Sequence, residues 1–390
     1  NVSLVVTQPR RAPRTILLSQ EEVKSLKVGY RLDLLEMQAI AGDQLVVKLV
    51  AWDVRGSRGE SSKRNLQVSS PGFDAKRIAA LKLKRNLHNT LKKLSDEAEL
   101  LRKTVEDDAL PAFSGEDEGR KQQTAINAQA SSAKMEEQLE LVRDQLSDSL
   151  AASETGREAE DMNLVARALS ELQHEEFARA KSGVEKLQLG AAATEKVAKD
   201  AAAAAKQTAS KARALEQRFN EMLAAEEAAN IVGNLAYLSR EQKRINDAAK
   251  KEAAEKQDLA WERLARRENA AVNETRMVED MIESLSKNIS SSQARKTEKP
   301  MKTLADNRAE LEEALKSDDA GKELAKPAER MHNATRSAFS GMQSLERDLS
   351  KRAVNARRDL ARSAGRASEK VQQARKSAET LARDNSDDDA

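Results

Sequence analysis

From residue 73 onward, apolar residues recur every three or four positions and are separated by charged ones. This spacing places the apolar side chains on one stripe of an α-helix, and a stripe with alternating steps of three and four is the seam of a coiled coil. The pattern therefore predicts long amphipathic helices that pair along their stripes. Two seams are predicted to mediate self-association, and their residues are Leu87, Leu91, Leu94, Leu101, Val278, Ile282, Leu285 and Ile289.

Residues 1–71 follow a different pattern, in which short β-branched runs lie between proline and glycine residues. The clearest run is GDQLVVKLVAWD, whose side chains alternate between the two faces of a strand. We expect one face to be uncovered and the strand to present an open edge that recruits another strand. The residues of this predicted β-edge are Leu45, Val47, Leu49 and Ala51.

The number of strands decides how this β-module is interpreted. At most five strands fit into it, whereas an immunoglobulin-like sandwich needs about seven strands over about 100 residues. One interpretation is a truncated sandwich, completed by an upstream fragment or a neighbouring subunit. A second is a small open module whose apolar face is covered by the first helix, over residues 78–91. The third is that the strand assignment itself is wrong.

Proline, glycine and acidic clusters divide the helical part, because they interrupt helices. The breaks predict antiparallel hairpins rather than one continuous rod. The predicted fold class is mainly α, a long coiled-coil or helical-hairpin bundle with a small N-terminal Ig-like β-module, complete or truncated. The predicted segments are a β-module (1–71), a first coiled-coil helix (72–110), a loop (111–119), long helices (120–289), a linker with a short helix (290–327), a basic helix (328–384) and an acidic tail (385–390).

Composition narrows the possible function classes. Charged residues make up 34% and aromatic residues 2%, which favours narrow helix stripes over thick cores. There is no cysteine, so disulfides, thiolate metal sites and cysteine nucleophiles are excluded. His88, His174 and His332 each lack a second histidine at helical spacing, and we interpret them as solvated or seam-edge residues. No phosphate-binding loop or nucleophile elbow is present, and we predict a protein without enzymatic activity, cofactor or metal.

Charge is balanced overall but not along the chain. The net charge is +2, which gives no reason to expect a nucleic-acid partner for the whole protein. Basic residues dominate the last helix. They have three interpretations, in decreasing order of preference: pairing with acidic helices of the same bundle, binding to anionic lipid or another polyanion, and binding to nucleic acid. The residues predicted to face a polyanion are Arg352, Arg357, Arg358, Arg362 and Arg366.

Three stretches together resemble a known class of proteins. They are the GDQLVVKLVAWD hairpin, SPGFDAKR directly before the first seam, and NLAYLSREQKRINDAAKK. Residues 29–110 in particular are similar to large bacterial envelope proteins of unknown function that combine Ig-like domains with long coiled coils. The resemblance implies an envelope or extracellular location, with the cytoplasm as the alternative, and implies no catalytic residues. It also implies a C-terminal portion of a longer product, and Asn1 leads us to expect a processed or truncated N-terminus.

These observations predict a structural protein that assembles with itself. An elongated hairpin with alanine and leucine stripes does not bury them fully alone, which favours a homo-oligomer or filament. We therefore predict a filament subunit or scaffold of a bacterial envelope or surface structure. The alternative is a coiled-coil binding module for a protein partner or an anionic membrane surface. A helical pore-forming toxin is a third interpretation, but the alanine-rich stretch that would have to insert is too charged.

Overall fold

The computed structural model divides the chain into two units. Unit 1 consists of Asn1–Ala75 and Ala229–Leu345, and unit 2 consists of Lys76–Ala228 and Glu346–Ala390. The structure describes residues 1–7, 12–19, 28–30, 32, 34, 44–53, 55–68, 75–153, 156–188, 194–255, 258–316 and 324–387, and it describes their side chains except at 44, 67, 75, 252–255, 258–263, 364 and 366–387.

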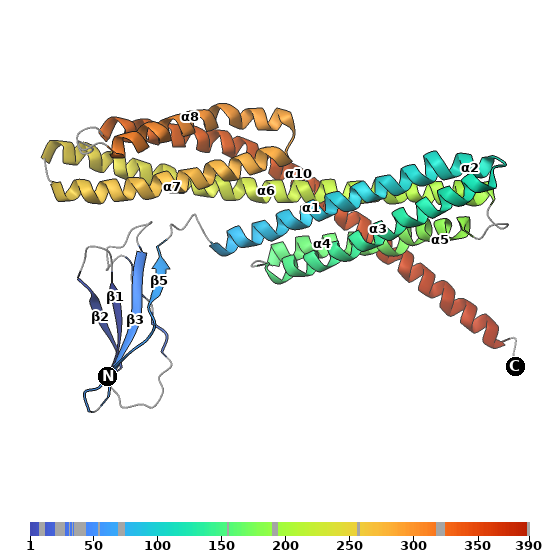
Figure 1. Ribbon diagram of the computed structural model, residues 1–390, viewed down its shortest axis with the longest axis horizontal. Helices are drawn as coiled ribbons and strands as arrows, with labels where there is room; N and C mark the ends of the chain where they lie inside the picture. Colours follow the sequence, from blue (N-terminus) through green and yellow to red (C-terminus); the bar gives the residue numbers. More distant parts are fainter. Residues whose placement is uncertain are drawn as a thin grey trace. The chain divides into compact units, whose positions relative to one another are not determined.

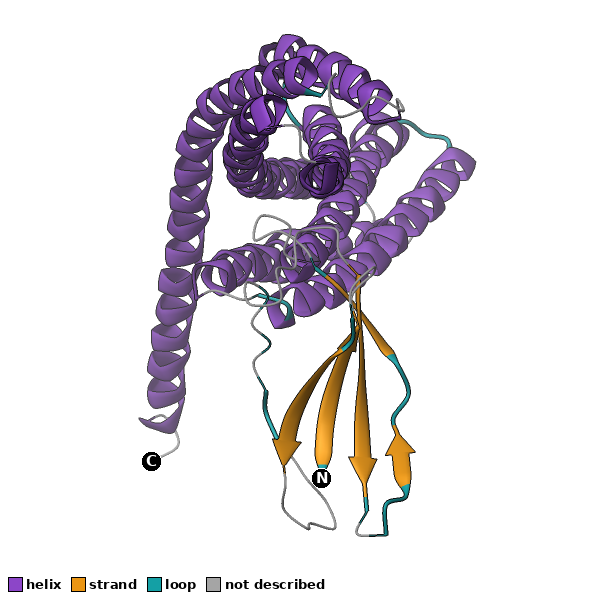
Figure 2. Cartoon of the chain, turned by 90° about the vertical axis from the view of Figure 1, so that its left-hand side faces the viewer, coloured by secondary structure: helices purple, strands orange, loops and turns teal. Residues whose placement is uncertain are grey.

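The N-terminal strands form one antiparallel sheet (Figure 2). Its strands are β1 (Val2–Thr7), β2 (Arg14–Ser19), β3 (Gln44–Trp52), β4 (Arg58–Glu60) and β5 (Arg64–Gln67), in the order β2-β1-β3-β4, with β5 also paired to β3. The turn after β3 is held by Asp53, whose Oδ1 accepts hydrogen bonds of 2.8 Å from the backbone N–H groups of Arg55 and Ser57. Gly56 has a φ of 80°, a conformation that favours glycine.

The strand predicted to be an open edge lies inside the sheet. Val47 of β3 pairs with Val6 of β1 on one side and with Arg64 of β5 on the other. The prediction of a β-edge at Leu45, Val47, Leu49 and Ala51 is therefore wrong. Strand β1 of the same chain pairs with β3 along the edge where a strand from another chain was expected. The described strands form a single sheet rather than two facing sheets. Most of residues 29–38, which belong to the predicted β-module, lie outside the described residues.

The apolar centre of the sheet is small. Leu45 and Val6 are buried on one face and pack with Val68, with Leu4 and Ile16 partly buried beside them. The predicted cover, residues 78–91, belongs to the first helix, where it makes contacts within unit 2. The mainly α fold class with a small N-terminal β-module is confirmed, and the sheet is the β-module.

Unit 1 continues with four helical segments, which Figure 1 shows side by side. Ion pairs join them: Arg267 of α7 with Glu241 of α6, and Arg330 of α10 with Glu310 of α8. Apolar residues spaced by three and four line the centre of the unit, as the seam pattern predicts. The segments are the second part of α6 (Glu195–Glu255), α7 (Asp258–Asn288), α8 (Ser291–Lys316) and the first part of α10 (Ala325–Asp387).

A linker and a short helix were predicted for residues 290–327. The linker before that helix is wrong, because α8 already begins at Ser291. Ser290 caps this helix: the side chain of Gln293 accepts hydrogen bonds from the backbone N–H and the hydroxyl of Ser290. Pro300 lies inside α8, where a proline usually ends a helix. The ring is accommodated by Gly341 of α10, since a Cβ atom there would lie 3.2 Å from Pro300 Cγ.

The described residues of unit 2 form nine helical segments. Its first helix runs further than predicted, because Pro111 stands in the first turn of α2, where its missing N–H is not needed. The break between this helix and the next one covers only residues 115–117. Asp117 then caps the next helix, because its side chain accepts a hydrogen bond from the backbone N–H of Arg120. The segments are α1 (Ala75–Lys103), the π-helix η1 (Thr104–Ala109), α2 (Leu110–Ser114), α3 (Glu118–Ala151), α4 (Gly156–Glu171), the π-helix η2 (Leu172–Phe177), α5 (Ala178–Leu187), the first part of α6 and the second part of α10.

Candidate functional site

Charged side chains are buried where α1 packs on α6 in unit 2. Lys84 is 3% exposed, and its Nζ lies 2.7 and 2.8 Å from the two carboxylate oxygens of Glu226. Glu158 of α4 adds a more distant contact of 4.0 Å. Lys84 lies three residues before the seam position Leu87, so the helix stripe itself turns this ammonium group inward. A buried cation of this kind needs such a partner, because an unpaired one is strongly disfavoured.

Two further pairs continue this α1–α6 contact. Arg85 forms an ion pair with Glu227, which is 1% exposed. Burial raises the pKa of Glu227, and the hydrogen bond from Arg85 counteracts part of this increase. His88 lies with Nε2 2.9 Å from Glu216 Oε1, and its ring faces Phe219 with centroids 6.4 Å apart.

The most concentrated charge cluster surrounds the π-helix η2. Glu171, Glu175 and Glu176 bring their carboxylate oxygens within 4.8 Å of one another, and Glu171 and Glu176 are buried. Lys211 of α6 forms ion pairs with both of these, at 3.1 Å from Glu176 Oε1. Burial alone would lower the pKa of Lys211, but its hydrogen bonds to Glu171 and Glu176 outweigh this effect and raise it. Glu176 is therefore a buried carboxylate that is paired within unit 2.

Three carboxylates at this spacing could in principle bind a divalent cation. Among the described residues, this is the group of three side chains whose oxygen atoms lie close enough together to share one cation. Lys211, however, already places an ammonium ion against two of the three carboxylates. In addition, the hydroxyl of Ser363 in α10 donates a 2.7 Å hydrogen bond to Glu171 Oε2. The arrangement fits a buried ion-pair cluster that ties η2 to α6 and α10 better than it fits a metal centre.

The basic residues of α10 are divided between the interior and the solvent. Arg357 makes two parallel 2.7 Å hydrogen bonds to the carboxylate of Asp161 in α4, and these bonds raise its pKa. The prediction that Arg357 faces a polyanion is therefore wrong, because its guanidinium group is paired within unit 2. Arg352, Arg358 and Arg362 are exposed. The side chain of Arg366 lies outside the described residues.

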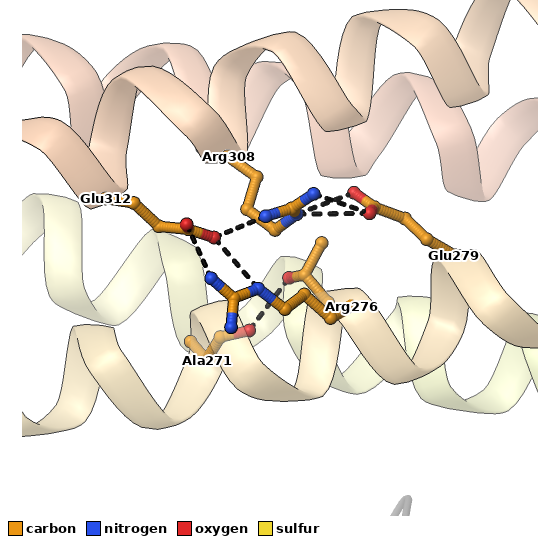
Figure 3. Close-up of polar contacts among 6 residues, drawn as sticks. Ala271, Arg276, Glu279, Arg308 and Glu312 are labelled. Atoms are coloured by element: carbon orange, nitrogen blue, oxygen red, sulfur yellow. Dashed lines mark hydrogen bonds and ion pairs between the residues drawn. The ribbon is translucent and has the colours of Figure 1, made fainter.

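A second charge network links α7 to α8 in unit 1 (Figure 3). Arg308 lies between two carboxylates: its Nε is 3.0 Å from Glu279 Oε1, and its Nη1 contacts Glu312. Arg276 contacts Glu312 from the other side: its Nε lies 3.1 Å from Glu312 Oε1, and its Nη2 lies 2.6 Å from Glu312 Oε2. These four side chains alternate in sign, so each charge has an opposite neighbour. Arg276 is half-exposed, and solvent weakens its contribution to stability.

The seam residues predicted to mediate self-association are mostly buried within one chain. The four in α1 lie in unit 2 and the three in α7 lie in unit 1, all at most 2% exposed, whereas Ile289 follows the last residue of α7 and is half-buried. Their burial therefore needs no second copy, and self-association through them stays a prediction. The buried residues are Leu87, Leu91, Leu94, Leu101, Val278, Ile282 and Leu285.

No protein family, curated protein or solved structure matches this chain. What the buried charges do must therefore be argued from their own geometry. Each of these pairs joins two segments that are distant in sequence, and fixing the register of packed helices is one known use of such pairs. Within the described part of the chain, none of the helices has the length and apolar character needed to cross a membrane.

The buried charges were missed by the seam prediction, although a signal for them exists. That prediction considered only apolar residues. Lys84 precedes Leu87 by three positions, and Glu176 follows Leu172 by four, so both continue a seam. A polar residue at seam spacing is a sign of a buried polar contact. Its partner, however, cannot be named from spacing alone.

Proposed function

We propose that this chain is a non-catalytic structural protein that assembles into homo-oligomers or filaments through its N-terminal sheet. One observation carries the proposal, namely the large apolar side chains that the sheet leaves in solvent. Leu17 is 49% exposed, Leu49 is 43%, Trp52 is 36% and Leu66 is 45%. Large apolar side chains that are exposed on one small element are a starting point for an interaction surface.

The distribution of these residues supports a second copy as the partner. Leu49 lies on the face that also carries Leu66, while Trp52 and Leu17 lie on the other, by the register of the pairs. One chain thus presents apolar surface on both faces of its sheet. Identical copies can then associate without a different partner, and if the two faces meet head to tail the assembly is a ring or an open filament, depending on the rotation between copies.

The proposal is tested by replacing Leu49 and Leu66 together with aspartate. The wild-type chain should sediment as an oligomer, and the double variant should sediment as a monomer with unchanged helix content. Leu141→Asp is a matched control, because Leu141 is also 43% exposed but lies on α3. A wild-type chain that remains monomeric at high concentration, or a double variant that assembles like the control, would refute the proposal.

A second function is favoured by the exposed arginines of α10. Arg352, Arg358 and Arg362 give this part of the helix a basic surface, and Arg362 is 76% exposed in its side chain. Such a surface supports a binding module for an anionic membrane or an acidic protein partner. Co-sedimentation with anionic and with neutral vesicles tests this membrane-binding function. A variant with all three arginines replaced by glutamate should lose binding to anionic vesicles. Equal binding of the wild-type chain to both vesicle types would exclude the function.

The cellular location belongs to the same proposal. We propose a bacterial envelope or surface structure, with the cytoplasm as the alternative. The support is the resemblance of residues 29–110 to envelope proteins. Fractionation of cells that express the full-length gene product, followed by mass spectrometry of its termini, separates the two locations.

A further inference from the structure

The seam between α6 and α7 of unit 1 contains an acid. Along α7, the buried positions step by four and three, and Glu268 occupies one of them with 0% exposure. Along α6, Gln242 occupies a seam position in the same way, also with 0% exposure. The neighbouring seam positions are Leu264, Ala271, Thr275 and Val278 on α7 and Leu235, Leu238, Ile245 and Ala249 on α6.

The carboxyl group of Glu268 is buried without the partners that a charge requires. Within the described part of the chain, neither of its oxygens has a hydrogen-bond partner of ordinary geometry, and the same holds for both polar atoms of the Gln242 amide. An ionised carboxylate in such surroundings is strongly disfavoured. The alternative available to the group is to keep its proton, since a neutral acid is buried at much lower cost.

Nearby charges do not compensate for the burial. Burial is the largest influence and raises the pKa of Glu268 to about 7, while the amide of Gln242 acts in the opposite direction. Glu241 of α6 raises the pKa further, and Arg267 of α7 lowers it. Glu241 and Arg267 form an ion pair with each other, so their effects on Glu268 largely cancel. Among the described residues, these are the charged side chains that act on it, whichever helix they come from.

We propose that Glu268 is a proton-binding site in the interior of unit 1, at which ionisation of the carboxyl group weakens the packing of α6 on α7. The proposal is independent of how copies of the chain associate. It differs from the ion pairs of unit 2, because Lys84, Lys211 and Arg357 each have a carboxylate partner.

The direction of the pH dependence follows from the two states of the chain. In the unfolded chain the carboxyl group has its ordinary pKa of 4.5, and in the folded chain about 7. Between these values the folded chain holds one more proton than the unfolded chain. Stability therefore falls as pH rises through this window and levels off above it. The full effect corresponds to a change in the unfolding equilibrium constant on the order of a hundredfold.

The first test is infrared spectroscopy of the full chain, which detects the C=O stretch of a protonated carboxylic acid directly. Glu268→Gln is the variant of choice, because glutamine has the shape of the neutral acid and does not ionise. At pH 6, the wild-type spectrum minus the variant spectrum should show this band, and at pH 9 the band should be gone. Subtraction also removes the signal of Glu227, which both chains share.

The second test is urea unfolding of both chains between pH 5 and pH 9. The unfolding constants should be closest near pH 5 and separate as pH rises, and at pH 9 the unfolding constant of Glu268→Gln should be the smaller by on the order of a hundredfold. Glu283→Gln makes the same substitution on the exposed side of α7 and should run parallel to wild type over this range. No carboxylic acid band in the difference spectrum, or parallel curves for Glu268→Gln and wild type, would overturn the proposal.

Discussion

Replacement of Gly183 by alanine tests how closely α5 and α6 pack. A Cβ atom at Gly183 would lie 2.8 Å from Ala201 Cβ and 2.9 Å from Ala201 Cα, shorter than real contacts of this kind. The second of these is a backbone atom, so a rotamer change cannot relieve the contact and one helix must move. Overpacking of this kind costs about 1–3 kcal/mol, whereas alanine gains about 1 kcal/mol over glycine inside a helix. We expect the clash to outweigh the gain, with a net loss of stability of up to about 2 kcal/mol.

Gly233 provides the matched control, because it lies inside α6 with nothing within 4 Å of its would-be Cβ. There the same substitution should stabilise the chain by about 1 kcal/mol. The measurement is urea unfolding followed by circular dichroism, with the two variants and wild type side by side. If Gly183→Ala stabilised the chain as much as Gly233→Ala does, the close crossing of α5 and Ala201 would not exist. Adding Ala201→Gly should recover part of the loss.

Three other predictions concern charges and seams. Arg85→Met should destabilise unit 2 by about 3–5 kcal/mol in urea unfolding, because it leaves the buried Glu227 without its partner. Lys250→Ala should leave the melting temperature unchanged, since its ion pair with Glu329 is half-exposed on both sides. Leu94→Asp should cost several kcal/mol, because Leu94 is fully buried, and an unchanged melting curve would place that side chain outside the core.

The helices could be predicted because their signal is local. Leu91 and Leu345, for example, lie on stripes whose period is visible within two turns, and both are fully buried. The small N-terminal sheet was predictable for the same reason, since alternation over a few residues identifies a strand. Local rules failed where a residue departs from its usual position. Pro300 lies inside α8 rather than at its end, and the close contact of its ring with Gly341 of α10, 41 residues further along the chain, has no local signal.

The candidate sites depend on contacts between distant segments, and these could not be predicted. The position of β3 at the centre of the sheet results from its pairing with Asn1–Thr7, about forty residues earlier in the sequence. Lys84 is buried as a charged group because its ammonium group pairs with Glu226, which is 142 residues away in the sequence. Glu268 stands at seam spacing, but whether an acid at such a position is paired, solvated or neutral depends on what the opposite helix offers. Gln242 offers no charge.

Neither unit is a single stretch of sequence, and this has a consequence for synthesis on the ribosome. Unit 1 begins the chain but lacks Ala229–Leu345 until late, and unit 2 lacks its part of α10 until the very end. Asp161 must wait for Arg357, 196 residues later, which is roughly 10–40 s at about 5–20 residues per second. During that time the nascent chain exposes apolar stripes that are not yet covered, so exposed apolar surface persists until the last helix has been made.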